Sequence, residues 1–296
     1  MKLRIKYKML SPVSHIGETA STGSYFQTVL TSSGRVPVIT GNSIRGQLRD
    51  SMAAHLLDTI SKNSLLGAKV SKDVFNILFS GGNINGTMKD DVEKAKKVRE
   101  HFPMISLLGG GLGDMIMAGR LISTFAYPVC QETESITGIE SDLSWHSLID
   151  EIEFTRMDDA KDDRTADYLL DTTEDKTAKA STQMRFSVQY MAAGTEFVQD
   201  FIFLDGTTDL ELGAFYAGLV KWFKVPHLGG MSAKGFGLFN AVVGDGEISV
   251  KNGGVAVSSE PGRLISAYED FIEGEGMEYF SMLGTKKEKK NGKAAD

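Results

Sequence analysis

The order of the predicted elements indicates an α+β fold of the ferredoxin type. A strand at residues 2–10 is followed by a helix that begins near residue 43. A hairpin over residues 184–204, a helix over residues 212–223 and a strand over residues 238–243 come later in the chain. Strand, helix, hairpin, helix and strand in this order are typical of a two-layer α+β sandwich.

The first strand has one apolar face and one basic face. Its apolar side chains are Leu3, Ile5, Tyr7 and Met9, and its basic side chains are Lys2, Arg4, Lys6 and Lys8. Since successive side chains of a strand point to opposite faces, the apolar set predicts the core side. The basic set is either a surface for an anionic partner or an ordinary solvated face, and the sequence leaves both open.

Two of the predicted helices are defined by apolar side chains at helical spacing. For the helix near residue 43 this stripe is Ile44, Leu48, Met52 and Leu56, and for a helix near residue 259 it is Leu264, Ile265, Tyr268 and Phe271. Either Asn42 or Ser43 can cap the first of these helices. Arg45 and Arg49 share a second face of it.

The domain organisation follows from composition. We expect one domain over residues 1–283, interrupted by insertions at residues 62–150 and 156–182, and a disordered basic tail at residues 284–296. The second insertion is polar and acidic, which is typical of a segment that projects from a folded body. Residues 16–34 are rich in Gly, Ser and Thr and predict a loop or a loose hairpin.

Composition restricts the class of protein. No apolar run approaches the roughly 20 residues that span a bilayer, and the alternating N-terminus is no signal-peptide core. Cys130 is the only cysteine, which excludes an internal disulfide and fits a reducing cytoplasm. The net charge of −7 is concentrated in residues 150–180, whereas residues 1–60 carry seven Lys or Arg against three acids. Because salt screens distant charges, a local patch can still bind an anion.

Residues 37–49 predict an anion site. Gly41 precedes a helix start, where unpaired backbone N–H groups and the helix dipole favour a phosphate. Arg45 and Arg49 lie close enough to pair with it, and Gly46 leaves room for a ligand beside the helix. The alternative is an ordinary capped helix with two surface arginines.

Residues 229–237 form a second candidate, with four glycines and Lys234 in nine residues. Such a loop can wrap its backbone around a phosphate. It is no Walker A loop, since Phe236 stands where that motif needs lysine. The run from Lys234 to Phe239 is similar to the first motif of RNA-recognition domains. A plain glycine-rich turn before a strand is the alternative.

Catalytic and metal-binding patterns are scarce. Residues 109–113 fail the dinucleotide pattern, and no two of the five histidines have metal-ligand spacing. His15 and His227 could act as acid and base in RNA cleavage, which remains an alternative. The aspartates at residues 158–163 either bind a cation or belong to a solvated loop. We expect no cofactor and no metal.

Taken in order, these segments resemble the RAMP superfamily of CRISPR–Cas proteins, and within it the Cas-seven family of backbone subunits. The run LSPVSHIG at residues 10–17 is similar to the family's opening, and VITGNSIRGQLR at residues 38–49 is similar to its G-S-S-x-K-G-x-L-R signature. Residues 229–237 resemble its C-terminal glycine-rich loop. FTRMDD at residues 154–159 and MRF at residues 184–186 resemble the borders of its thumb hairpin.

The resemblance implies a palm similar to an RNA-recognition domain, with fingers inserted at residues 62–150 and a thumb at residues 156–182. Copies of such subunits stack head to tail along a guide RNA and, with other CRISPR effector subunits, present it to a complementary nucleic acid. The residues that we expect to contact RNA are Lys6, His15, Gly41, Asn42, Ser43, Arg45, Gly46, Arg49, Met157, Arg164, Gly230, Met231, Ser232, Ala233, Lys234 and Gly235.

One departure from the family separates the functional alternatives. Members that cut target RNA carry an aspartate after the I-G motif, whereas residues 16–34 contain no Asp. We therefore expect a subunit without catalysis of its own and favour a DNA target. The type IV backbone subunits look closest, through residues 102–130 as well. A guide-processing endoribonuclease of the same superfamily and a stand-alone single-stranded RNA-binding protein are the alternatives.

Overall fold

The computed structural model describes most of the chain. The described residues are 1–19, 23–61, 69–84, 92–113, 115–156 and 184–275. The predicted thumb segment, apart from Arg156, and the predicted basic tail lie outside them. Among the described residues, no helix is both long enough and apolar enough to cross a membrane.

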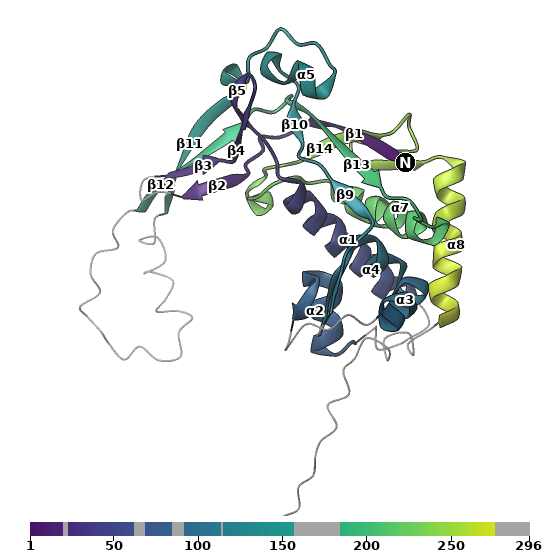
Figure 1. Cartoon of the computed structure of the whole chain (residues 1–296). Helices are drawn as coiled ribbons and strands as arrows, with labels where there is room; N and C mark the ends of the chain where they lie inside the picture. The colour runs from purple at the N-terminus through teal and green to yellow at the C-terminus, as the bar shows by residue number, and fades with distance from the viewer. Residues whose placement is uncertain (20–22, 62–68, 85–91, 114, 157–183, 276–296) are drawn as a thin grey trace, which may run out of the picture.

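Seven strands form the main sheet, and all of their pairings are antiparallel. The strand order is β10-β13-β1-β14-β15-β16, and β9 also pairs with β13. The strands are β1 (Lys2–Met9), β9 (Leu121–Ser123), β10 (Tyr127–Pro128), β13 (Glu196–Phe203), β14 (Phe239–Val243), β15 (Ile248–Lys251) and β16 (Gly254–Val257). Figure 1 shows this sheet above the long helices.

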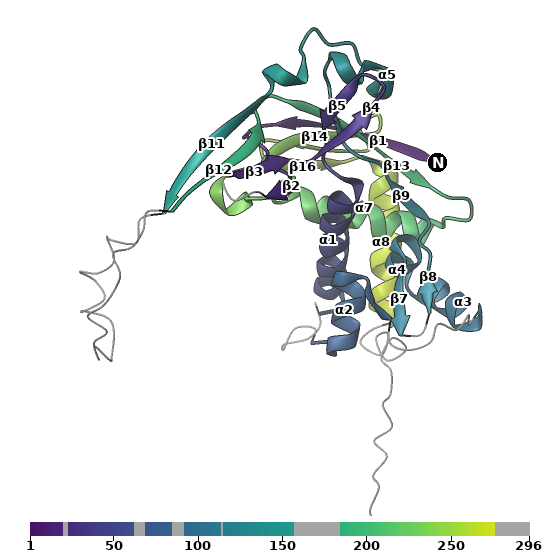
Figure 2. The same ribbon diagram turned by 60° about the vertical axis from the view of Figure 1, so that its left-hand side comes forward.

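Three long helices lie on one face of the main sheet: α1 (Gly41–Ser61), α7 (Asp209–Phe223) and α8 (Ser259–Glu275). The short η1 (Gln131–Thr133) and α5 (Glu134–Thr137) lie on the other side (Figure 2). The frame β1, α1, β9 and β10, β13, α7, β14 has the strand order of a ferredoxin-type sandwich. The predicted α+β class is therefore confirmed.

The predicted hairpin over residues 184–204 is wrong, although both of its strands exist. β12 (Met184–Met191) pairs with β11 (Ile149–Arg156) and β3 (Gly23–Phe26) in a second sheet, whereas β13 pairs with β1 in the main sheet. The turn between them packs against the end of β1, where the Met9 N–H donates to the Thr195 carbonyl at 2.9 Å. β9 and β10, rather than β12, therefore supply the second strand of the ferredoxin frame, beside β13.

The second sheet has the order β11-β12-β3-β2, and its β2 (Ile16–Thr19) pairs with β3 where a loop or loose hairpin was expected. β4 (Thr28–Thr31) and β5 (Gly34–Pro37) form a separate hairpin. The first predicted insertion contains α2 (Lys72–Ser80), β6 (Gly82–Ile84), α3 (Val92–His101), α4 (Pro103–Leu108), β7 (Gly110–Gly113) and β8 (Ile116–Met117).

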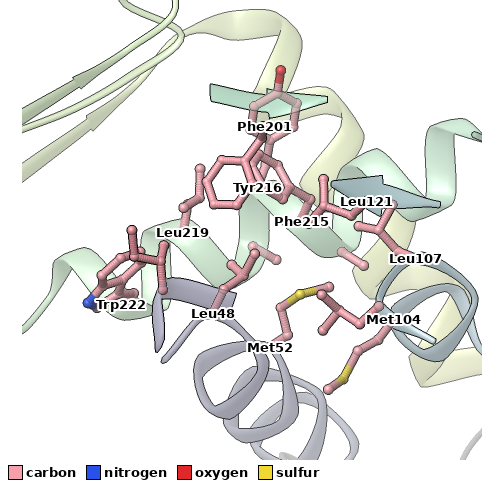
Figure 3. Close-up of a cluster of buried hydrophobic side chains, with 14 of the residues drawn as sticks. Leu48, Met52, Met104, Leu107, Leu121, Phe201, Phe215, Tyr216, Leu219 and Trp222 are labelled. Atoms are coloured by element: carbon pink, nitrogen blue, oxygen red, sulfur yellow. The ribbon is translucent and has the colours of Figure 1, made fainter. Parts of the chain in front are cut away.

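The core lies between the main sheet and the helices. Figure 3 shows side chains of α1, α4 and α7 packed together with those of β9 and β13. The predicted stripe of α1 is confirmed, since its four residues are at most 1% exposed. Each such side chain contributes about 1.5–3 kcal/mol through burial. Gly218 lets α7 approach α1 closely, because a Cβ there would lie 2.2 Å from Met52 Cγ.

Candidate nucleic-acid interface

The two predicted phosphate-binding segments meet at consecutive residues after β1, namely Ser14 and His15. The Gly230 N–H donates to the Ser14 carbonyl at 2.7 Å, and the Thr40 N–H donates to His15 Nε2 at 3.2 Å. The Ser14 hydroxyl also donates to the Gln189 carbonyl of β12 at 3.1 Å. This Ser14–His15 junction therefore joins the start of α1, the loop at residues 229–237 and the second sheet.

Helix α1 is capped by Thr40, so the predicted cap at Asn42 or Ser43 is wrong. The Ser43 N–H donates to Thr40 Oγ1 at 3.4 Å, and the Ile44 N–H donates to the Thr40 carbonyl at 3.2 Å. Asn42 is exposed at the helix start, as an anion site requires. The first N–H groups of a helix have no acceptor within it, and since Thr40 accepts those of Ser43 and Ile44, the N–H of Asn42 is the one in position to meet a ligand.

Gly41 is required at this position by its contacts. It is buried, and a Cβ on it would lie 2.2 Å from the Ser123 carbonyl oxygen and 2.7 Å from that of Thr124. These carbonyls lie at the end of β9 and directly after it, so the helix start is held against the main sheet. Gly46, one turn further on, is exposed with nothing within 4 Å of an added Cβ.

The loop at residues 229–237 presents an exposed arc to solvent. Met231, at φ 60°, and Gly235, at φ 85°, are left-handed and flank the short helix η4 (Ser232–Lys234). Residues 232–235 are all exposed, which fits their predicted contact with RNA. The base of the loop is fixed because the Gly237 N–H donates to the Pro12 carbonyl at 2.7 Å.

The side chain of Lys234 turns toward the second sheet. Its Nζ lies 4.6 Å from the ring centre of Phe154 on β11 and 4.7 Å from that of Phe186 on β12. It forms no ion pair with a carboxylate within the described part of the chain. Cation–π contacts orient the ammonium without neutralising it, so its charge stays available to a phosphate.

The similarity to an RNA-recognition motif does not extend to an aromatic platform. Phe239 is fully buried and meets Tyr7 edge-to-face at 5.2 Å, on the helix side of the sheet. Phe236 is 6% exposed and packs against Tyr190 and Phe154. Neither ring can stack on a base, so the loop offers its backbone and Lys234 instead.

Arg45 and Arg49 face backbone carbonyls of α4 and β9 rather than open solvent. Arg45 donates to the Leu121 carbonyl at 3.0 Å and to the Leu108 carbonyl, and Arg49 donates to the carbonyls of Leu108 and Gly109 at 3.2 and 3.0 Å. These last two carbonyls end helix α4, where cations are favoured by the helix dipole. The two arginines therefore tie α4 to α1, and the alternative of two surface arginines is wrong for Arg49.

Burial lowers the pKa values of both arginines. Arg49 is 9% exposed, and burial, together with the neighbouring charge of Arg45, lowers its pKa to about 10. Burial also lowers the pKa of Arg45. Both line a glycine-rich cavity of about 370 Å³ together with residues 109–111 and Gly119. Arg49 remains protonated at neutral pH, but its carbonyl partners leave it poorly placed for an exposed phosphate.

The basic face of β1 is largely paired with acids of β13. Lys2 and Arg4 contact Asp200 at 2.7 and 2.8 Å, and Lys8 contacts Glu196 at 3.2 Å. Lys6 is exposed, and among the described acids none forms an ion pair with it. Of this predicted basic face, Lys6 is thus the residue best placed to contact an external anion.

The two histidines of the cleavage alternative have different surroundings. His15 Nε2 accepts the Thr40 N–H, and burial lowers the His15 pKa. His227 is half-buried and its Nδ1 lies 3.0 Å from the Val225 carbonyl. No group of three metal-binding side chains occurs within the described residues. Met157 and Arg164 lie outside the described residues, so their predicted contacts with RNA stay predictions.

Several functional positions were missed from the sequence. Thr40 could have been found, because a threonine three residues before Ser43 is a common helix cap. Two other features depend on contacts between distant segments. One is the support that Ser14 gives to the loop, and the other is the pair of aromatic rings that Lys234 contacts. No local pattern reports such contacts.

The main sheet and the Ser14–His15 junction define the class of this protein: a ferredoxin-type sandwich with a glycine-rich loop beside a helix start. The RAMP superfamily model matches residues 6–240, and the chain therefore belongs to the RAMP superfamily. No curated protein matches the sequence. A chain of a solved Type IV-B CRISPR complex has a similar fold, with a TM-score of 0.58 and 19% identity over 83% of this chain and 91% of that chain.

Proposed function

We propose that this protein is a guide-RNA-binding subunit of a CRISPR effector complex. The observation that carries the proposal is the Ser14–His15 junction, which places the start of α1 beside the loop at residues 229–237. Both elements offer backbone N–H groups, and neither offers an aromatic ring to a base. Such a surface grips a sugar–phosphate chain without reading its sequence and leaves the bases free to pair.

The charge distribution supports binding of RNA despite the net charge of −7. Many acids of the described body are already paired with bases, as Asp200 is with Lys2 and Arg4. Two cations are different, because Lys234 of the loop contacts aromatic rings and Lys6 of β1 lies in solvent. Local positive charge is what a phosphate experiences within the screening length of about 8 Å.

Copies of the chain assemble head to tail along the guide, in contact with other effector subunits, and present it to a target that we expect to be DNA. The family and the similar chain from a Type IV-B CRISPR complex support this assembly. A heterologous contact of this kind produces an open helix whose length follows that of the RNA. The subunit does not cleave RNA, and the role of His15 Nε2 as an acceptor for a backbone N–H supports this reading.

Co-expression with a CRISPR array, followed by purification and electron microscopy, tests the proposal. A helical assembly that contains guide RNA and lengthens with the RNA is the expected result. A protein that carries no RNA and takes none up would overturn it. A monomer on a discrete RNA site would favour the stand-alone binding protein, and cleavage of repeat RNA that is lost in His15→Ala or His227→Ala would favour the endoribonuclease.

A further inference from the structure

The ring of His15 lies at the centre of the candidate interface. We propose that His15 is a positioning residue, which holds the capped start of α1 beside the loop through Nε2, and that it makes no direct contact with RNA. This inference rests on the proposed function, because it concerns the same site. It also assigns to His15 a role that differs from its predicted contact with RNA.

The hydrogen bonds determine which nitrogen of His15 carries the proton. The Thr40 N–H can only donate, so at 3.2 Å His15 Nε2 must accept. The Thr40 hydroxyl lies 3.1 Å from the same nitrogen. A neutral ring that accepts at Nε2 carries its proton on Nδ1. The edge-to-face contact with Phe26, at 6.3 Å, supplies an apolar neighbour that suits a neutral ring.

Thr40 transmits this constraint to the helix. Its hydroxyl accepts the Ser43 N–H and its carbonyl accepts the Ile44 N–H, so the direction of Thr40 sets the direction of the first turn. A ring that binds both the N–H and the hydroxyl of Thr40 fixes that direction from one side. The close approach of Gly41 to the Ser123 and Thr124 carbonyls fixes it from the other.

The position of His15 in the chain extends the constraint to the loop. Ser14, directly before it, accepts the Gly230 N–H at 2.7 Å. One dipeptide therefore sets the separation between the start of α1 and the N–H groups of residues 231–233. A site that binds successive phosphates depends on that separation, since misplaced donors lose most of their hydrogen-bond energy.

Two substitutions of His15 by uncharged residues distinguish a role in positioning α1 from a direct contact with RNA. In His15→Gln the amide oxygen can occupy the place of Nε2 and accept the Thr40 N–H, whereas in His15→Asn the amide reaches only the place of Nδ1. If His15 positions the helix, His15→Gln binds a single-stranded RNA oligonucleotide nearly as well as the wild type, and His15→Asn binds it about tenfold more weakly. The reverse order would indicate contact with RNA through Nδ1 and would overturn the proposal.

Hydrogen exchange of the Thr40 amide provides a readout without RNA. We expect slow exchange in the wild type and in His15→Gln, and faster exchange in His15→Asn. Equal exchange in all three proteins would overturn the positioning role, whatever the RNA result. The expected exchange pattern together with no RNA binding by any of them would contradict the proposed function while supporting the positioning of Thr40.

The tautomer of the wild-type ring keeps the inference testable if His15→Asn does not fold. Nitrogen chemical shifts of His15 at neutral pH should show a protonated Nδ1 and an unprotonated Nε2. A proton on Nε2 is incompatible with acceptance of the Thr40 N–H and would overturn the proposal.

Discussion

The ammonium group of Lys234 lies 4.6 Å from the ring centre of Phe154, which joins the exposed loop to strand β11. The two residues are far apart in the sequence, and the contact leaves the lysine charged and accessible. It therefore positions one cation of the loop against the β11–β12 ribbon at the Phe154–Phe186 pair, where the proposed RNA strand would pass.

Replacement of Lys234 by Met should weaken RNA binding without a loss of fold. The aliphatic part of the side chain still covers the rings, but one phosphate contact is lost. We expect affinity to fall about tenfold, or roughly 1.4 kcal/mol, and the slope of log K against log salt to shrink by about 0.7. Lys97→Met, an exposed lysine on α3, is the matched control and should leave both unchanged. Equal effects of the two substitutions would show that only total charge matters.

Arg49→Met should act on stability rather than on the RNA contact. The substitution leaves the Gly109 carbonyl without its donor and the Leu108 carbonyl with Arg45 alone, at a cost of about 1–3 kcal/mol in the free energy of unfolding. Urea unfolding measures this cost, and Arg35→Met, in the exposed β4–β5 hairpin, is the control. If stability is unchanged and the slope of log K for RNA binding against log salt shrinks, Arg49 instead contacts a phosphate, as the family resemblance implied.

Two glycines of α1 should respond in opposite ways to alanine. Gly41→Ala forces a Cβ against the Ser123 and Thr124 carbonyls and should destabilise the protein by about 1–3 kcal/mol. Gly46→Ala adds a Cβ in open space within a helix and should stabilise it by about 0.5–1 kcal/mol. If RNA passes close to Gly46, the more stable variant binds it more weakly. An unchanged affinity would place the strand elsewhere.

Asp200 should make stability depend on acidic pH. Burial opposes ionisation of this carboxyl, but hydrogen bonds and charge from Arg4 and Lys2 outweigh it and lower its pKa below 3.8. The unfolded state thus binds the proton more readily, so this contribution is complete above the unfolded pKa and is lost as pH falls through the folded pKa. Urea unfolding across acidic pH should show a decline that Asp200→Asn reduces. The same decline in both proteins would assign it to other carboxylates.

The parts of the fold that the sequence predicted are those set by local periodicity. The alternation of β1 and the stripe of α1 each report a buried face, and Leu48 and Tyr7 lie where that pattern places them. The hairpin prediction failed because alternation identifies a strand but not its partner. The two strands, Met184–Met191 and Glu196–Phe203, belong to different sheets.

The candidate site likewise has features that local sequence predicted and features that depend on distant contacts. Glycine content and position near a helix start identified residues 37–49 and 229–237, and the structure brings them together. The role of Arg49 could not be predicted, because its acceptors Leu108 and Gly109 are distant in sequence. The sequence shows that a cationic side chain is present at a position. The packing of distant segments decides whether that side chain faces a ligand or a backbone carbonyl.

The most direct test of the central claim is an electron cryomicroscopy structure of the protein bound to single-stranded RNA. We expect phosphates within hydrogen-bond distance of the Asn42 N–H at the start of α1 and of the N–H groups of residues 231–233, with Lys234 beside the strand and the bases turned outward. RNA bound only on the open face of β14–β16, or in the cavity beside Arg49, would contradict the account.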